Sequence, residues 1–390
     1  MKQIITFSAI ILFIMAGCGR NRQVDEIDGY ITIDVTGSYP QKELFLQDFM
    51  DVEYIALETS DEFLTQGVVE AIGSEYILVI NLIRDGDIFI FDRKTGKGVR
   101  KINRQGQGPE EYNRISGTTG IILDEANGEM FVKSTGDKIL VYDLYGKFKR
   151  SFISSHVDMF EYNNDNLFCY DMSDYYNIGE ERKKAYHVII SKLNGSITRE
   201  IFIPFETIHT PVLRKGDVTA STSELPQIIP NQGTWILADM SSDTLYMYAP
   251  DNTLRPFLVR TPSIRAMNPE VYLSMVALTD RYYFMKTVEN DFDLEKQTGF
   301  RMNTLMYDKQ EKAVFKYVVY NDDYIEKRPL FSMMWSPFNH EIAACLRLES
   351  FSLVEDYKKG ILKDGKLKEI AATLDVEDNP VIMLIKHKKI

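Results

Sequence analysis

The chain has 390 residues and a formal net charge of −12 at pH 7. Because binding to nucleic-acid phosphates requires a cationic surface, this charge disfavours a nucleic-acid function. The 22 Tyr and 22 Phe, against 2 Trp, suit a chain that consists mostly of β-strands.

The first residues have the pattern of a bacterial export signal. Lys2 precedes an apolar run, Ile4 to Met15, which is too short to span a bilayer. The following Met15-Ala16-Gly17-Cys18 resembles a lipobox, in which the cysteine becomes the acylated first residue of the mature protein. We therefore expect a signal peptide at residues 1–17, lipidation of Cys18 and a tether over residues 18–30. Secretion with Cys18 left as a free thiol is the alternative.

After the tether, a strand-turn-strand unit recurs about every 50 to 60 residues, close to the blade length of propeller repeats. Two clear copies are Asp87–Asp92 followed by Val99–Ile102, and Lys138–Asp143 followed by Phe148–Phe152. Such a unit cannot bury both faces alone, and radial stacking of small antiparallel sheets forms a β-propeller. We therefore predict one all-β domain over residues 31–390.

The strands predict a six-bladed β-propeller with four-stranded antiparallel blades. The blades are expected at residues 68–102, 119–153, 157–204, 225–260, 275–320 and 332–386. The sixth has only three strands, at 332–336, 341–347 and 380–386, so its fourth must come from elsewhere. We expect Val52–Glu58 to become its outer strand and close the ring, because closure removes exposed sheet edges. Short helices are expected at 350–359 and 366–374, in an insertion covering about 350–375.

Four segments carry a family resemblance: Arg104–Tyr112, Val52–Glu58, Leu140–Phe148 and Asn379–Met383. With these segments the chain, from about residue 30 to 388, resembles the six-bladed β-propeller lipoproteins of Bacteroides-like bacteria. The resemblance implies the propeller fold and a place in the bacterial cell envelope, as an outer-membrane lipoprotein facing the periplasm or the cell exterior. The family is loosely similar to NHL-repeat propellers, which mostly bind rather than catalyse.

Loop lengths differ between the two expected faces of the propeller. If the strands of each blade are lettered A to D outward from the axis, the A-B and C-D connections lie on one face, here the short-turn face. The B-C and D-A connections lie on the other, here the long-loop face. The first are short, such as 73–75 and 144–146, whereas the second include 103–118, 173–185 and 205–224. Since long loops on a rigid scaffold usually carry function, the sequence predicts that ligands bind on the long-loop face.

Aromatic and charged residues of these loops are candidates for a ligand site. Aromatic rings suit sugars or peptides, and arginine suits a carboxylate. The candidates are Arg104, Gln107, Glu110, Tyr112, Tyr175, Tyr176, Arg182 and Arg301. A structural role is the alternative for each: Tyr112 would pack beneath the crossing between the first two blades, and Arg104 and Glu110 would form an ion pair.

Signals of catalysis are weak. The chain has no Gly-x-Ser-x-Gly and no His-Glu-x-x-His motif, and its five histidines have no ligand spacing. Loop carboxylates such as Asp85 and Asp291 could pair for glycoside chemistry, and Asp291 with Asp293 could hold calcium, although solvated loop acids are common. We expect neither cofactor nor metal. Cys169 and Cys345 are expected to be buried thiols, with one disulfide as the alternative.

These observations predict a membrane-anchored binding or scaffolding propeller that takes a glycan, a peptide or an envelope protein as its partner, and no nucleic acid. One alternative is an envelope lyase or hydrolase that acts on polysaccharide or peptide at the propeller mouth. Another is a partner subunit of an uptake complex, which would expose a flat apolar patch on the long-loop face.

Overall fold

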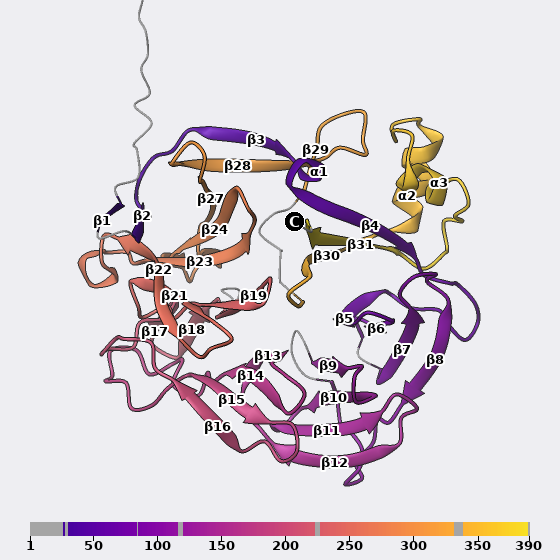
Figure 1. Ribbon diagram of the computed structural model, residues 1–390, viewed down its shortest axis with the longest axis horizontal. Coiled ribbons are helices and arrows are strands. Elements are labelled where there is room, and N and C mark those ends of the chain that lie inside the picture. Colours follow the sequence, from indigo (N-terminus) through magenta and orange to yellow (C-terminus); the bar gives the residue numbers. More distant parts are fainter. Residues whose placement is uncertain are drawn as a thin grey trace, which may run out of the picture.

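The computed structural model describes residues 26–388, apart from 28–29, 84, 116–119, 223–226 and 331–337. Small antiparallel sheets stand side by side around a central axis, with the innermost strand of each directed toward it (Figure 1). The protein is an all-β propeller of six blades, as the sequence predicts.

The first three blades each consist of four consecutive antiparallel strands. Blade one contains β5 (Val68–Ile72), β6 (Tyr76–Ile80), β7 (Asp87–Asp92) and β8 (Gly98–Asn103); blade two contains β9 (Ile121–Asp124), β10 (Glu129–Ser134), β11 (Lys138–Asp143) and β12 (Phe148–Ile153); blade three contains β13 (Val157–Glu161), β14 (Asn166–Tyr170), β15 (His187–Ser191) and β16 (Ile197–Ile201). Their middle strands are buried on both faces because each blade is covered by a neighbour on either side. These strands therefore read as continuous apolar runs, whereas β8 and β12 alternate.

Blades four and five follow the same plan, whereas the described part of blade six has three strands, the outer of which comes from the N-terminal part of the chain. Blade four contains β19 (Ile228–Asn231), β20 (Thr234–Leu237), β21 (Thr244–Tyr248) and β22 (Leu254–Thr261); blade five contains β23 (Val271–Leu278), β24 (Tyr282–Glu289), β27 (Met302–Asp308) and β28 (Ala313–Asn321); blade six contains β30 (Ile342–Leu348), β31 (Val381–His387) and β4 (Met50–Ala56). The strand predicted at 332–336 lies outside the described residues.

The ring is closed by an N-terminal strand, as predicted. β4 pairs antiparallel with β31 along its whole length, with Tyr54 opposite Met383 and Val52 opposite Ile385. Polar contacts also join blade six to blade one, since the Arg93 guanidinium lies 3.2 Å from Glu341 and 3.6 Å from Glu53. An apolar cluster that includes residues of β4, β7 and β31 fills the space between these two blades. The closing seam is therefore packed like the other boundaries between blades.

Two further strands precede β4, and the sequence does not predict them. β2 (Tyr30–Asp34) pairs in parallel with β22, and β3 (Gln41–Phe45) pairs in parallel with β28. The short helix α1 (Leu46–Phe49) then leads into β4. Residues 30–56, here the N-terminal belt, thus run along the outer edges of blades four, five and six (Figure 1). β1 (Glu26–Ile27) pairs with β2.

Arginines at the third position of the outer strands connect successive blades. Arg100 of β8 donates a 2.7 Å hydrogen bond to the Leu144 carbonyl in blade two, and Arg150 of β12 donates to the Lys192 carbonyl in blade three at 3.0 Å. Each arginine thus satisfies a carbonyl in the C-D turn of the next blade. These bonds fix the angle between neighbouring sheets.

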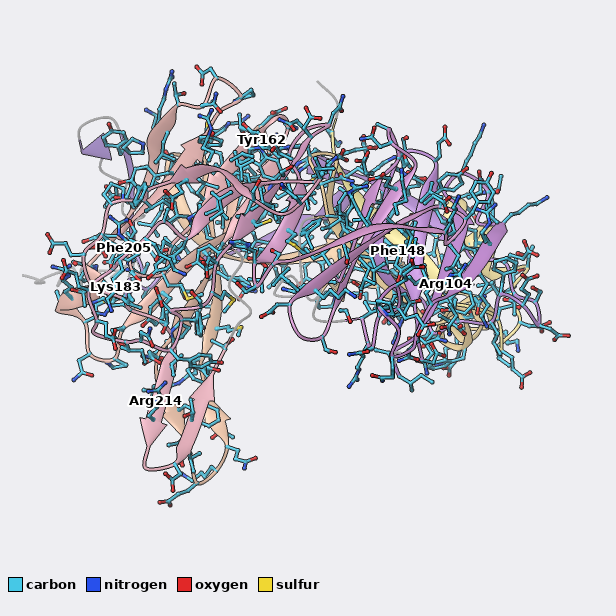
Figure 2. All side chains as sticks on the ribbon, turned by 90° about the horizontal axis from the view of Figure 1, so that it is seen from below. Arg104, Phe148, Tyr162, Lys183, Phe205 and Arg214 are labelled. Atoms are coloured by element: carbon cyan, nitrogen blue, oxygen red, sulfur yellow. The ribbon has the colours of Figure 1, made fainter. Side chains whose placement is uncertain are left out.

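The insertions lie outside the ring of sheets. α2 (Ser350–Lys358) and α3 (Lys366–Ala371) pack on blade six, close to their predicted positions. Two hairpins, β17 (Val212–Lys215) with β18 (Val218–Ser221) and β25 (Phe292–Asp293) with β26 (Thr298–Gly299), extend from the long-loop face. Figure 2 shows Arg214 in the projecting hairpin, and Tyr162, from a turn of blade three, at the opposite face. The 3-10 turn η1 (Ile264–Ala266) and β29 (Arg328–Pro329) complete the elements.

Cys169, on β14, and Cys345, on β30, are both free thiols, so the disulfide alternative does not hold. None of the helices within the described ranges is long and apolar enough to cross a membrane.

Candidate functional site

The predicted candidates in the crossing between blades one and two hold that crossing together. Tyr112 is fully buried. Its hydroxyl donates to the Gly86 carbonyl at 2.6 Å and accepts from the Arg104 backbone N–H at 2.9 Å. Burial raises the pKa of Tyr112 to about 12. The Arg104 guanidinium donates to the Gly146 carbonyl in blade two at 2.7 Å. Tyr112 therefore packs as its structural interpretation expects.

The expected Arg104–Glu110 ion pair does not form among the described residues. Arg104 uses its Nε on a backbone carbonyl instead. Gln107 and Glu110 are exposed, and the carbonyl of Glu110 accepts from Tyr142 at 2.7 Å. The loop is thus fixed by bonds to backbone carbonyls rather than by the ion pair.

The candidates of blade three also have structural partners. Tyr175 is buried, and its hydroxyl donates to the Thr222 carbonyl. Its ring belongs to an apolar cluster beneath the two hairpins, here the satellite core: Tyr175, Val212, Met240, Ile264, Tyr272, Val288 and Phe300. Tyr176 is half exposed and its ring meets that of Tyr175 edge-on, 5.3 Å between centroids.

The two remaining candidate arginines lie apart from these tyrosines. Arg182 donates to the Ile203 carbonyl and covers the Phe205 ring at 4.8 Å. Arg301 is exposed and lies 3.7 Å from both Glu289 and Asp291. The eight candidates therefore lie in separate parts of the long-loop side and do not converge on one cavity. As ligand-binding residues they stay predictions, and Cys18 lies outside the described residues.

The carboxylates considered for catalysis or calcium have partners close to them in the chain. Asp291 pairs with Arg301 and Asp293 with Lys296 at 2.9 Å, whereas Asp85 accepts from the Asn81 side chain at 2.8 Å and from the Asp87 backbone N–H at 3.1 Å. Within the described ranges, no group of three or more His, Cys, Asp or Glu side chains is placed to hold a metal ion.

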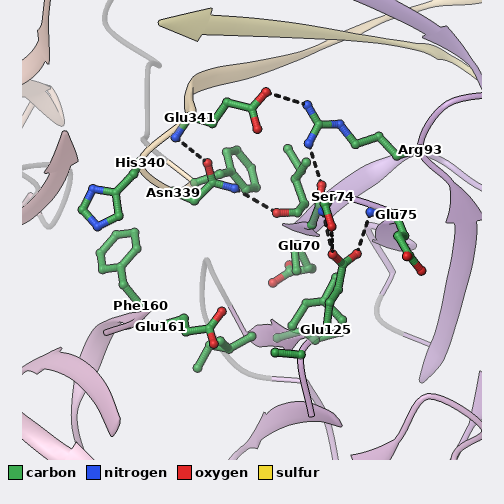
Figure 3. Close-up of a pocket in the computed structure, with 18 of the residues that line it drawn as sticks. Glu70, Ser74, Glu75, Arg93, Glu125, Phe160, Glu161, Asn339, His340 and Glu341 are labelled. Carbon is green, nitrogen blue, oxygen red and sulfur yellow. Dashed lines mark hydrogen bonds and ion pairs between the residues drawn. The ribbon is translucent and has the colours of Figure 1, made fainter. Parts of the chain in front are cut away.

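A cavity lies on the other face. It encloses about 660 Å³ beside the axis, between the A-B turns of blades one, two and six and the inner strand of blade three (Figure 3). We call it the axial cavity. Its floor is apolar and includes Ala71, Ile72, Ile122, Met159 and Phe160. The described turns around it are short, and Gly73 and Ala126 at its mouth have little or no side chain. None of the eight predicted residues lines it.

Two buried or half-buried ionic groups make the rim rigid. The Glu125 carboxylate accepts from the backbone N–H groups of Ser74, Glu75 and Tyr76 at 2.7, 2.9 and 2.8 Å, and from the Ser74 hydroxyl at 2.5 Å. Glu125, which belongs to blade two, thereby fixes the A-B turn of blade one. The Arg93 guanidinium is buried and donates to the Gly73 carbonyl at 2.6 Å as well as to Glu341. Blades six, one and two are thus held together at the mouth.

Aromatic residues form one wall. The rings of His340 and Trp235 lie 4.4 Å apart, and Phe160 lies 5.9 Å from Trp235. His340 Nδ1 accepts the Gly233 N–H at 3.2 Å. Burial lowers the pKa of His340 to about 4, so the ring is neutral at pH 7. Asn339 keeps the turn in place by donating to the Ile72 carbonyl at 2.9 Å.

Three of the carboxylates that line the cavity are open to solvent, those of Glu75, Glu161 and Glu341. The side chains of Glu161 and Glu341 are 40% and 43% exposed. Glu161 Oε1 lies 2.8 Å from Lys192, which also pairs with the buried Asp124 at 2.6 Å. In both glutamates one oxygen has an ionic partner, and the other is free of partners among the described residues.

A family model described as a 6-bladed beta-propeller matches residues 21–342, most of the chain. The protein belongs to this family. Among proteins with curated descriptions, none matches this propeller.

Solved structures share its architecture. A "putative exported protein" from Bacteroides fragilis is 16% identical, covers 90% of this chain and 100% of its own, and superposes with a TM-score of 0.56. This likeness shows the fold. The RRP9 WD40 repeats are 7% identical with 90% and 99% coverage and a TM-score of 0.34, and U3-55K is 8% identical with 70% and 90% coverage and a TM-score of 0.33.

The residues of the axial cavity do not stand out in the sequence of this propeller. Each is an ordinary turn or strand residue, and loop length directs attention to the opposite face. One signal is present: an acidic residue recurs at or beside the A-B turn in several blades, as Glu75, Glu125, Glu161, Asp280 and Glu341. Such a recurrence at equivalent positions places like charges around the axis, because equivalent turns of a propeller meet there.

Proposed function

We propose that this propeller is an exported protein of the bacterial cell envelope that binds a ligand in its axial cavity, on the short-turn face. The observation that carries the proposal is the cavity itself, with about 660 Å³ of space, an apolar floor and a polar rim. Its volume lies within the range of about 300–1,000 Å³ that is usual for small-molecule sites. The apolar floor favours binding by releasing water, and the rim groups orient the ligand.

The rim is held in place before a ligand arrives. Glu125 and Asn339 bond to the backbone of blade one from blades two and six, and Arg93 of blade one bonds to the Gly73 carbonyl and to the Glu341 side chain of blade six, so little side-chain freedom is lost on binding. Glu125 accepts four hydrogen bonds and His340 Nδ1 accepts from Gly233, so neither the Glu125 carboxylate nor this nitrogen is free to take up a proton as a general base.

For location, we propose export through residues 1–17 and anchoring through a lipid on Cys18. The apolar run and the Ala16-Gly17-Cys18 sequence support this proposal, as does the description of the similar Bacteroides fragilis protein as exported. Changing Cys18 to Ala should move the protein from the membrane fraction to the soluble fraction with an unchanged melting temperature. Membrane association that persists in the variant would contradict the anchor.

The binding proposal is tested by narrowing the cavity mouth. Ala126 is exposed in a turn at the mouth, so Ala126→Trp fills the entrance without disturbing the core. The control is Asn164→Trp, in an exposed turn of blade three outside the cavity lining. A panel of neutral sugars and of neutral, basic and acidic peptides is screened by thermal shift. We expect at least one compound to raise the Tm of the wild type and of Asn164→Trp, and not of Ala126→Trp.

The same screen tests the long-loop face. If the compound still stabilises Ala126→Trp, and stabilisation is lost in Tyr176→Ala or Arg301→Ala, the ligand binds on the long-loop face and the proposal is wrong. Both residues are exposed enough for truncation to leave the fold intact.

A further inference from the structure

We infer that the ligand of the axial cavity presents an ammonium or guanidinium group on an aliphatic stem. The inference rests on the proposed function, because it concerns the same cavity. It follows from counting which hydrogen-bonding groups the cavity has left to offer.

The donors around the cavity are directed at the protein. Arg93 donates to Gly73 and Glu341, the Ser74 hydroxyl donates to Glu125, and Asn339 donates to Ile72. The Arg93 side chain is 9% exposed, so it presents little to a ligand. Two side chains of the lining are exceptions. The indole N–H of Trp235 has no acceptor among the described residues, and since His340 Nδ1 accepts from Gly233, the neutral His340 ring carries its proton on Nε2.

The acceptors, in contrast, are open. Glu161 and Glu341 lie on opposite sides of the cavity, with His340 and Phe160 along the wall between them (Figure 3). Each carboxylate is about two-fifths exposed and has one oxygen without a partner in the described part of the chain. A ligand that bridges them must bring donors of its own, and charge-assisted donors bind carboxylates most strongly.

The charges that line the axial cavity also favour a cationic ligand. Among the described residues that line the cavity, the carboxylates of Glu75, Glu125, Glu161 and Glu341 outnumber the one guanidinium, that of Arg93. His340 adds no charge at pH 7, and Lys192 behind Glu161 is already paired with Asp124. Low-dielectric walls strengthen such a field inside a cleft, so cations are attracted and a ligand carboxylate is repelled.

The shape of the cavity fits a cation that has an apolar stem. The methylenes of a lysine- or arginine-like group bury against apolar surface such as Ile72, Ile122 and Phe160, while the charged end stays with the carboxylates. The aromatic wall adds attraction for a cation over a ring face. A basic side chain of a peptide and a free polyamine share this chemistry.

The experiment titrates the full chain with tetralysine, tetraarginine and spermidine as probes, and with tetraglycine and tetraglutamate as controls. The test variant is Glu161→Gln with Glu341→Gln, which keeps the shape and removes two charges. The matched control is Glu377→Gln with Asp375→Asn, two exposed acids in the loop that follows α3. Melting curves establish that all variants are folded.

We expect at least one cationic probe to bind the wild type and to bind the test variant about tenfold or more weakly, as loss of charge-assisted bonds implies. The control variant should bind within about twofold of the wild type. Binding of the peptides alone identifies a basic protein segment as the ligand type, and binding of spermidine alone identifies a free polyamine; either result supports the inference.

Three results would overturn the inference. Equal weakening in the test and control variants would show attraction to the overall negative charge. A second such result is that no cationic probe binds, while a neutral or acidic ligand binds the wild type and not Ala126→Trp. The proposed function then holds, but the inference that the ligand is a cation is wrong. If no probe or panel compound is sensitive to Ala126→Trp, both fail.

Discussion

The two faces of the propeller use their side chains differently. On the long-loop face the connections are long and rich in aromatic residues, yet they pack on one another, and Tyr175, Tyr272 and Phe300 form the satellite core. On the short-turn face the connections are minimal, and the axial cavity remains beside the axis.

This difference shows that loop length and binding space are not equivalent. A long loop can bury its own apolar groups and so fill the space that it surrounds. A ring of short turns held by groups such as Glu125 and Arg93 leaves a cavity among the described residues.

Opening the ring is the strongest test of this difference between the two faces. The axial cavity is bordered by blades one and six, whereas the satellite core lies in blades three to five, so loss of closure should affect the short-turn face first. We expect a chain starting at Met50, which keeps β4, to fold with lowered stability. A chain starting at Leu57 lacks β4, and its free energy of unfolding should be lower by at least a further ~5 kcal/mol. This chain lacks the buried side chains of Met50, Tyr54 and Ile55, and it exposes the edge of β31.

Urea denaturation followed by circular dichroism measures both truncated chains. Equal midpoints for the two chains would show that β4 does not close the ring. If both are less stable than the full chain by the same amount, the loss comes from β2 and β3 alone.

A second prediction concerns the long-loop face. Tyr175→Ala should destabilise the protein by about 3–5 kcal/mol, because it leaves a cavity in the satellite core and removes the hydroxyl partner of Thr222. Tyr176→Ala is the matched control and should cost less than ~1 kcal/mol, since that side chain is half exposed. The free energies of unfolding come from urea titration. Similar losses in both variants would contradict a structural role that is specific to Tyr175.

Much of the fold can be predicted from the sequence, and the contrast with the site has a physical cause. Strands such as β7 and β11 lie where their apolar runs and flanking turns predict them, because every blade repeats the same local pattern. The pairing of β4 with β31 can be predicted because the C-terminal part of the sequence supplies only three strands for the last blade.

The belt strands β2 and β3 cannot be predicted in this way. Each is short and half exposed, and its partner, β22 or β28, lies more than two hundred residues away along the chain. The cavity is harder still to predict. Glu125, Glu161 and Glu341 look like ordinary turn acids, and only the circular arrangement of the blades brings them to one opening.

A third prediction sharpens the account of the short-turn face. Glu125→Ala should destabilise the protein by about 1–3 kcal/mol, because three backbone N–H groups and the Ser74 hydroxyl lose their acceptor. Glu75→Ala, an exposed acid in the adjacent turn, should have an effect below ~0.5 kcal/mol. Thermal denaturation distinguishes the two, and a neutral effect of Glu125→Ala would show that the turn is rigid without it.

The smallest expected effect is a pH dependence at the outer rim of the short-turn face. Burial by itself would raise the pKa of Asp308, but hydrogen bonds from Arg281, Lys42 and the backbone N–H groups of Gln310 and Glu311 lower it from 3.8 to about 2. Because the pKa is lower in the folded state, Asp308 stabilises the protein above about pH 4. This contribution is lost as the pH falls through about 2.

We therefore expect Asp308→Asn to be less stable than the wild type above pH 4, with a difference that narrows toward pH 2. Asp217→Asn, in the exposed tip of the long-loop hairpin, is the control and should show no such trend. Urea midpoints at several pH values provide the measurement. A difference between wild type and Asp308→Asn that stays constant with pH would contradict the depressed pKa.

The N-terminal belt also has a consequence for synthesis and export. The belt is translated before its partners β22, β28 and β31, which follow it in that order along the chain. Pairing across such long separations is slow, and it cannot start before the partner strands exist. A chain that is cut short before residue 381 would keep the edge of β4 unpaired and open to proteases, so the ring is sealed only after β31 has been translated.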